Sequence, residues 1–142
     1  MTEFQASSTT GPQRSRPLSP HIQIYRFMLT YVMSGIHRIT GAALYFGMIL
    51  VAWWLIAAAS GPNAYGYFEW FIGSLIGRLV LLGYTWDLIH HAVGGIRYLL
   101  WDLGYGAERS EREFLALTSI IGSVALTLVV WVVGYLAMGG PR

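Results

Sequence analysis

The sequence predicts an all-α membrane protein with three transmembrane helices. Of its 142 residues, 55% are hydrophobic and only 11% are charged, whereas a soluble domain carries about 25% charged residues. Segments 39–59 and 114–138 contain no charged residue at all, and each meets the ~20 residues that a helix needs to cross a bilayer. A third apolar segment lies between them.

The first predicted helix spans residues 29–59 and begins before its uncharged part. Ser34, His37 and Arg38 therefore lie in its first turns, near one membrane surface. Residues 1–28 form an extended N-terminal segment. The connection at residues 60–67 is rich in glycine, proline and asparagine and has no charge, which predicts a loop.

The second predicted helix spans residues 69–102, and the third spans residues 114–138, followed by a tail at 139–142. Together the three helices make residues 29–138 one transmembrane domain. The second helix is apolar but carries Arg78, Asp87, His90, His91 and Arg97. Ionisable groups at membrane depth are costly and usually mark a ligand, ion or cofactor site, so its polar residues are expected to face protein or cofactor.

The arginines predict the orientation in the membrane. They gather before and at the start of the first helix and around the second connection, while connection 60–67 has none. The positive-inside rule then places the N-terminus in the cytoplasm. The net charge of +2 is too small for nucleic acid. The absence of cysteine excludes disulfides and thiolate ligation of metals within this chain.

The two adjacent histidines of the second helix are the candidate cofactor residues. His91 shares a face with Gly94 and Gly95, which leaves room for a flat macrocycle, while His90 points about 100° away. A neutral imidazole suits haem iron, so His91 is a candidate axial ligand. The alternative is an interhelical hydrogen bond without cofactor, and His90 is interpreted in that way. Asp87, one turn away, either orients an imidazole or is a protonated structural residue.

A second candidate site lies on the first helix. Ser34 and Arg38 are one turn apart, and His37 flanks them. A hydroxyl, a fixed cation and an imidazole together suit an oxygen-bearing headgroup, either a quinone or a phospholipid. The alternative is an interfacial anchor, in which Arg38 contacts lipid phosphate.

Four segments occur in an order that is familiar from one family: 16–25 (RPLSPHIQIY), 34–41 (SGIHRITG), 91–97 (HAVGGIR) and 101–104 (WDLG). With these motifs the chain resembles the cytochrome b membrane-anchor subunit of succinate dehydrogenase, respiratory complex II. The resemblance covers about residues 16–138. Each motif alone is weak, and their order and spacing make the combination specific.

The resemblance implies a subunit of succinate:ubiquinone oxidoreductase that does not catalyse alone. It implies a second small anchor subunit, packed against this one, and a flavoprotein and an iron–sulfur subunit seated on both. Haem b lies between the anchors and takes one histidine from each, which maps to His91 here, and His37 supports a haem propionate or the quinone pocket. Ubiquinone binds the serine and arginine that map to Ser34 and Arg38.

The same resemblance implies a multi-pass protein of the bacterial inner membrane, with the mitochondrial inner membrane as the less favoured alternative. Two positions depart from the family pattern: Gly35 replaces a bulky aliphatic residue, and Tyr98 replaces a histidine. Two other interpretations stay open, namely the anchor of a fumarate reductase and a small non-enzymatic membrane scaffold.

Overall fold

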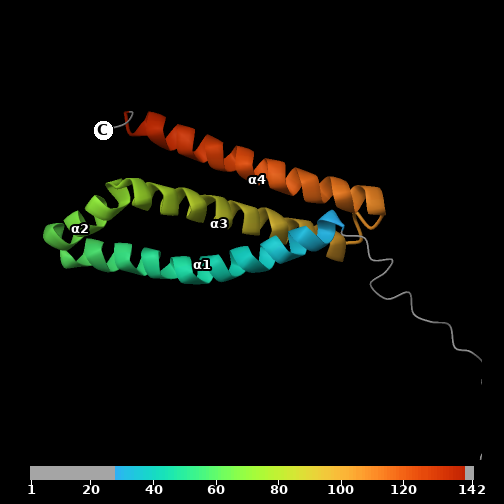
Figure 1. Ribbon diagram of the computed structural model, residues 1–142, viewed down its shortest axis with the longest axis horizontal. Helices are drawn as coiled ribbons and strands as arrows, with labels where there is room; N and C mark the ends of the chain where they lie inside the picture. Colours follow the sequence, from blue (N-terminus) through green and yellow to red (C-terminus); the bar gives the residue numbers. More distant parts are fainter. Residues whose placement is uncertain (1–27, 140–142) are drawn as a thin grey trace, which may run out of the picture.

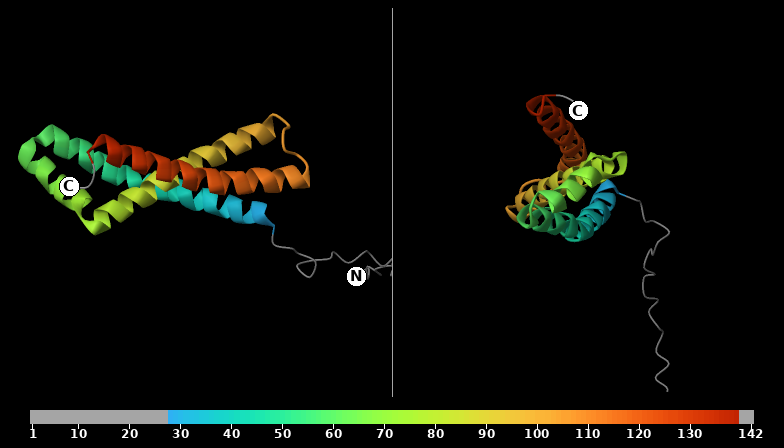
Figure 2. Two further views of the ribbon diagram at one scale, coloured as in Figure 1. Left: turned by 90° about the horizontal axis from the view of Figure 1, so that it is seen from above. Right: turned by 90° about the vertical axis from the view of Figure 1, so that its left-hand side faces the viewer.

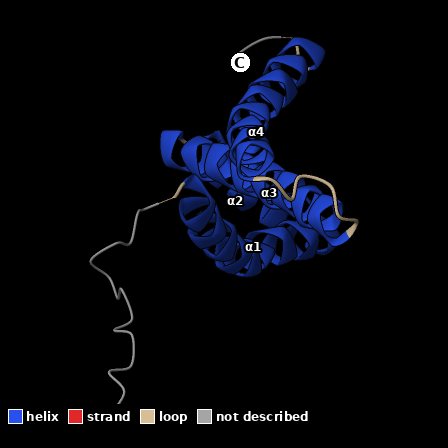
Figure 3. Ribbon diagram, turned by 90° about the vertical axis from the view of Figure 1, so that its right-hand side faces the viewer, coloured by secondary structure: helices blue, strands red, loops and turns tan. Residues whose placement is uncertain are grey.

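The computed structural model describes residues 28–139, in which four helices follow one another: α1 (Leu29–Ser60), α2 (Pro62–Gly73), α3 (Leu75–Asp102) and α4 (Arg109–Ala137) (Figure 1). No strand occurs in that range, so the all-α prediction is confirmed there (Figure 3). The N-terminal segment predicted at 1–28 and the tail predicted at 139–142 lie outside these residues, apart from Met28 and Gly139.

Helices α1 and α4 are each long and apolar enough to cross a membrane. Helices α2 and α3 qualify only if they are counted together as one broken span. The described chain therefore has two candidate spans, or three with the broken pair. This result agrees with a membrane protein, while the predicted number of three spans depends on how the broken pair is counted.

The prediction of a loop at residues 60–67 is corrected, because α2 already begins at Pro62. Gly61 ends α1 with φ 104°, a conformation that glycine adopts without steric cost. Pro62 then occupies the first turn of α2, where its missing N–H is no disadvantage. The glycine and proline that predicted a loop instead form a tight corner between two helices.

The single second helix predicted at 69–102 is also corrected, because the chain bends by 81° between α2 and α3. Ser74 lies at the bend in an extended conformation. Its hydroxyl donates to the carbonyl of Phe71 (2.6 Å) and accepts from the backbone N–H of Gly77 (3.0 Å). One serine thus ends α2 and caps the start of α3.

Helix α4 begins at Arg109, earlier than the predicted residue 114. The reason is a capping box, in which the side chains of Glu108 and Glu111 each accept from the other's backbone N–H. The start of α1, the end of α3 and the start of α4 share one end of the molecule, while α2 and the end of α4 share the other (Figure 1). Viewed from above, α3 crosses the other two long helices at an angle (Figure 2).

The interior between the helices is small and polar, and the outer faces are apolar. The buried residues of α3 and α4 include Asp87, His90, Gly94, Arg97, Ala116, Ser119, Ser123 and Thr127. Large apolar side chains are exposed along α1 and α4. This inverted distribution is typical of helices that pack through small and hydrogen-bonding residues within lipid.

Candidate functional site

The adjacent histidines of α3 point to different helices. The ring of His91 stacks on His37 of α1, with centroids 4.1 Å apart and planes 3° from parallel. His90 instead places its Nδ1 3.0 Å from Ser123 Oγ of α4 and stacks on Trp86. Of the sequence-predicted site residues, the structure therefore brings His37 and His91 together and leaves His90 apart.

Thr40 of α1 is a contact that the sequence analysis did not single out. Its Oγ1 lies 3.2 Å from His91 Nδ1 and donates to the backbone carbonyl of His37 at 3.0 Å. Thr40 lies three residues after His37, on the same side of α1. The three-residue spacing in the sequence indicates that Thr40 and His37 share a face of α1. It does not indicate a contact with His91, which depends on the position of α3 beside α1.

Two glycines allow the close approach of α1 and α3 at the histidines. A Cβ atom on Gly41 would lie 3.1 Å from Cε1 of His91, and one on Gly94 would lie 2.5 Å from Nδ1 of His37. The space expected over Gly94 for a macrocycle is therefore filled by the ring of His37. Gly95 has nothing within 4 Å of its would-be Cβ atom, so the open part of this face lies there.

The nitrogen atoms of the two α3 histidines differ in access. His90 is 1% exposed, and its Nε2 is buried without a hydrogen-bond partner. His91 is only half-buried, and its Nε2 makes no hydrogen bond and is not among the enclosed, unpartnered polar atoms of residues 28–139. His91 therefore presents the more accessible nitrogen lone pair.

Ser34 and Arg38 lie one turn apart near the start of α1. Ser34 is half-buried and Arg38 is exposed. In the described part of the chain, neither side chain makes a hydrogen bond or an ion pair. A polar hydroxyl and a cation are thus available at this end of the molecule, next to the turn that carries His37.

Arg97 and Asp87 are buried, in agreement with the expectation that polar residues of this segment face protein or cofactor. Arg97 is 2% exposed, and all three of its guanidinium nitrogens lack hydrogen-bond partners among the described residues. The rings of Tyr98 and Trp101 cover it, with centroids 5.5 and 5.2 Å from its Cζ. Asp87 makes no hydrogen bond to His91, whose Nδ1 is taken by Thr40.

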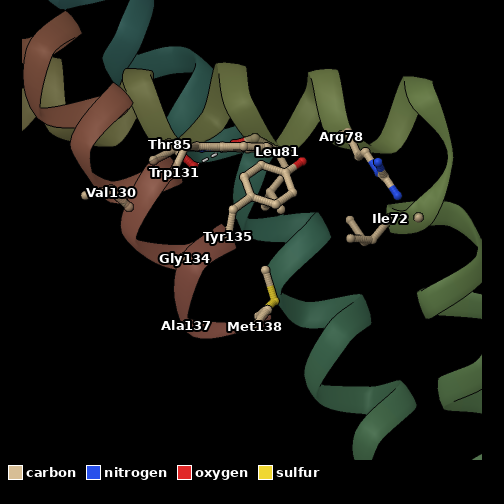
Figure 4. Close-up of a pocket in the computed structure, with 11 residues that line it drawn as sticks. Ile72, Arg78, Leu81, Thr85, Val130, Trp131, Gly134, Tyr135, Ala137 and Met138 are labelled. Carbon is tan, nitrogen blue, oxygen red and sulfur yellow. Dashed lines mark hydrogen bonds between the residues drawn. The ribbon is translucent and has the colours of Figure 1, made fainter. Parts of the chain in front are cut away.

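A groove of about 780 Å³ lies at the opposite end of the described chain, where α2 meets α3 and α4 ends. Figure 4 shows side chains of α3 and of the end of α4 around it, with Tyr135 near Leu81 and Arg78 to one side. Its lining is largely apolar and contains none of the predicted site residues. It therefore adds no chemistry to the histidine site.

These features define an all-helical membrane protein with a buried polar interior and an accessible imidazole between two long helices. Residues 12–130 match the family described as succinate dehydrogenase/fumarate reductase transmembrane subunit. The chain belongs to this family.

Curated relatives agree with the family match. The succinate dehydrogenase cytochrome b556 subunit of Paracoccus denitrificans is 40% identical over 119 residues, which cover 84% of this chain and 92% of the relative. The cytochrome b556 subunit of Rickettsia felis is 35% identical over 117 residues, covering 82% and 91%. The mitochondrial cytochrome b560 subunit of Bos taurus is 36% identical over 116 residues, covering 78% and 65%.

Proposed function

We propose that this chain is the cytochrome b membrane-anchor subunit of a succinate:ubiquinone oxidoreductase, with His91 as one axial ligand of haem b. The accessible Nε2 of His91, on a half-buried ring whose Nδ1 is already engaged by Thr40, is the observation that carries the proposal. The relatives named as cytochrome b subunits support it.

The residues around His91 fit a haem ligand. Neutral imidazole is a common ligand of haem iron, and the uncovered surface at Gly95, one turn along α3, leaves room beside it. A bound haem supplies a centre that accepts and releases one electron. His91 would bind its iron, while His37 packs against the back of the imidazole and limits its rotation.

We infer that the residue that would hold the haem together with His91 lies outside the described residues. The rings of His37 and His91 are stacked face to face at 4.1 Å, so the two would not hold one haem between them. His90 is directed into the interface with α4, with its Nε2 enclosed. As the family resemblance implies, we assign the second ligand to a second small anchor subunit packed against this chain.

Ser34 and Arg38 are proposed to bind ubiquinone. The Ser34 hydroxyl can donate a hydrogen bond to a quinone carbonyl oxygen. Arg38 is a fixed cation that stabilises the negative charge gathering on that oxygen as electrons arrive. Both side chains are free to do so, because neither has a partner in the described chain.

The end of the molecule that carries Ser34 and Arg38 is proposed to face the cytoplasm and to seat the iron–sulfur and flavoprotein subunits. Arg38, Arg109 and Arg112 lie at this end, and the exposed Arg78 lies at the other. Such an excess of arginine favours the cytoplasmic side of a bacterial inner membrane.

A visible spectrum of the purified native complex, with its subunits identified by mass, tests the proposal. We expect a reduced b-type haem band and co-purification of a flavoprotein, an iron–sulfur protein and a second small membrane subunit. A complex with all these subunits but no haem band would overturn the ligand assignment. A chain that purifies without any of them would overturn the subunit assignment.

A further inference from the structure

The hydroxyl of Thr40 has a single proton and lies within hydrogen-bond distance of two groups. Thr40 Oγ1 donates to the carbonyl of His37, 3.0 Å away and one turn back on α1. The same oxygen lies 3.2 Å from Nδ1 of His91. A carbonyl oxygen can only accept, so both contacts are hydrogen bonds at once when Thr40 donates to His37 and accepts from the Nδ1–H of His91.

This hydrogen-bond arrangement assigns a tautomer to His91. Its Nδ1 carries the proton and donates it to Thr40, so Nε2 carries the lone pair. Nε2 is also the nitrogen that makes no hydrogen bond and is not enclosed. Thr40 is 2% exposed, so water does not compete readily for its oxygen. The ring is thereby held with its basic nitrogen presented outwards.

We propose that Thr40 is the positioning residue of this haem site, setting both the tautomer and the electron-donating strength of His91; this inference rests on the proposed function. A ligand histidine that donates its other N–H to an oxygen is more basic. A more basic imidazole stabilises the oxidised iron, and hydrogen bonding of this kind is one means by which a protein tunes haem potential. Thr40 therefore lowers the midpoint potential of the haem.

The chain contains a matched control for this contact. Ser123 donates to the carbonyl of Ile120 at 2.9 Å and lies 3.0 Å from Nδ1 of His90. The arrangement repeats that of Thr40: a hydroxyl bonded one turn back on its own helix accepts from the Nδ1–H of a histidine on α3. His90, however, has its Nε2 enclosed and is not proposed to bind iron.

The experiment is a redox titration of the haem in the intact complex, in native membranes, for wild type, Thr40→Val and Ser123→Ala. Valine keeps the volume of threonine and removes the acceptor. We expect Thr40→Val to retain haem with a raised midpoint potential, and Ser123→Ala to keep the wild-type potential. A wild-type potential in Thr40→Val, or an equal rise in both variants, overturns the inference.

A second pair decides the matter if the Thr40→Val complex fails to assemble. Thr40→Ser and Thr40→Ala are both small and differ only in the hydroxyl, so we expect the serine variant alone to keep the wild-type potential. Equal potentials in the pair overturn the inference. If the wild-type complex contains haem and the Thr40 variants keep its potential, only this inference is overturned. If the wild-type complex contains no haem, the proposed function and this inference are both overturned.

Discussion

Gly94 of α3 lies directly against the imidazole of His37 of α1. A Cβ atom there would be 2.5 Å from His37 Nδ1, well inside van der Waals contact. At the neighbouring residue, Gly95, a Cβ atom would meet nothing within 4 Å. Two adjacent glycines thus face very different surroundings.

Gly94→Ala is expected to destabilise the subunit by ~1–3 kcal/mol, the usual cost of overpacking an interior, and to reduce haem content because the ring of His37 is pushed towards His91. Thermal unfolding of the detergent-solubilised complex and the haem-to-protein ratio measure both effects. Gly83→Ala, on the same helix and with nothing within 4 Å of its would-be Cβ atom, is the control and should behave as wild type. Equal behaviour of the two variants would argue against the close contact.

Substitution of the adjacent histidines should separate their roles. We expect His91→Leu to remove haem or strongly perturb its spectrum, because the accessible Nε2 is lost. His90→Leu should retain most of the haem, since its ring contacts Ser123 and Trp86 instead. The reduced-minus-oxidised spectrum measures both. Comparable haem loss in the two variants would contradict the assignment of the ligand to His91.

Arg38→Ala is expected to lower quinone reduction by at least about tenfold, in line with the loss of a group that stabilises developing charge. Succinate oxidation by an artificial dye should stay largely intact, because it bypasses the quinone. Arg78→Ala, which removes an exposed arginine near the start of α3, at the opposite end of the molecule, serves as control. Unchanged quinone turnover in Arg38→Ala would reject the role of Arg38.

Ser123→Ala is expected to weaken packing between α3 and α4. It leaves Nδ1 of the buried His90 without its hydrogen-bond partner, and interhelical hydrogen bonds in membrane proteins average ~0.6 kcal/mol. Unfolding in a denaturing detergent should therefore shift to slightly lower concentration. Thr118→Val removes a hydroxyl bonded only within α4 and should cause a smaller shift. A larger shift in Thr118→Val than in Ser123→Ala would contradict the contact between Ser123 and His90.

Hydropathy alone was sufficient to predict an all-helical membrane protein, because uncharged segments of that length have few other structures available. It could not predict the bend at Ser74. The break depends on one side chain that bonds both Phe71 and Gly77, and a serine within an apolar segment is equally compatible with an unbroken helix. The corner at Gly61 and Pro62 was interpreted as a loop for a similar reason. Glycine and proline are common both in loops and at the junction where one helix ends and the next begins.

Helix periodicity predicted that His90 and His91 point in different directions, and the structure shows their different neighbours. It could not predict those neighbours, because the contacts of His91 with His37 and Thr40 depend on how α1 is aligned beside α3. Arg97 was expected to face protein or cofactor, and the two rings that cover it belong to Tyr98 and Trp101 of the same helix. The roles of Ser34, Arg38, His37 and His91 stay predictions until they are tested.

The buried polar face of α3 has a consequence for biosynthesis. A lone Asp at the centre of a spanning helix costs ~2.5–3.5 kcal/mol on insertion scales. Helix α3, counted with α2 as one span, carries Asp87 near its centre and Arg97 closer to its end. Helix α1 leaves the ribosome first and can shield this face as α3 enters the bilayer. Loss of α1 should therefore impair not only cofactor binding but the membrane integration of α3 itself.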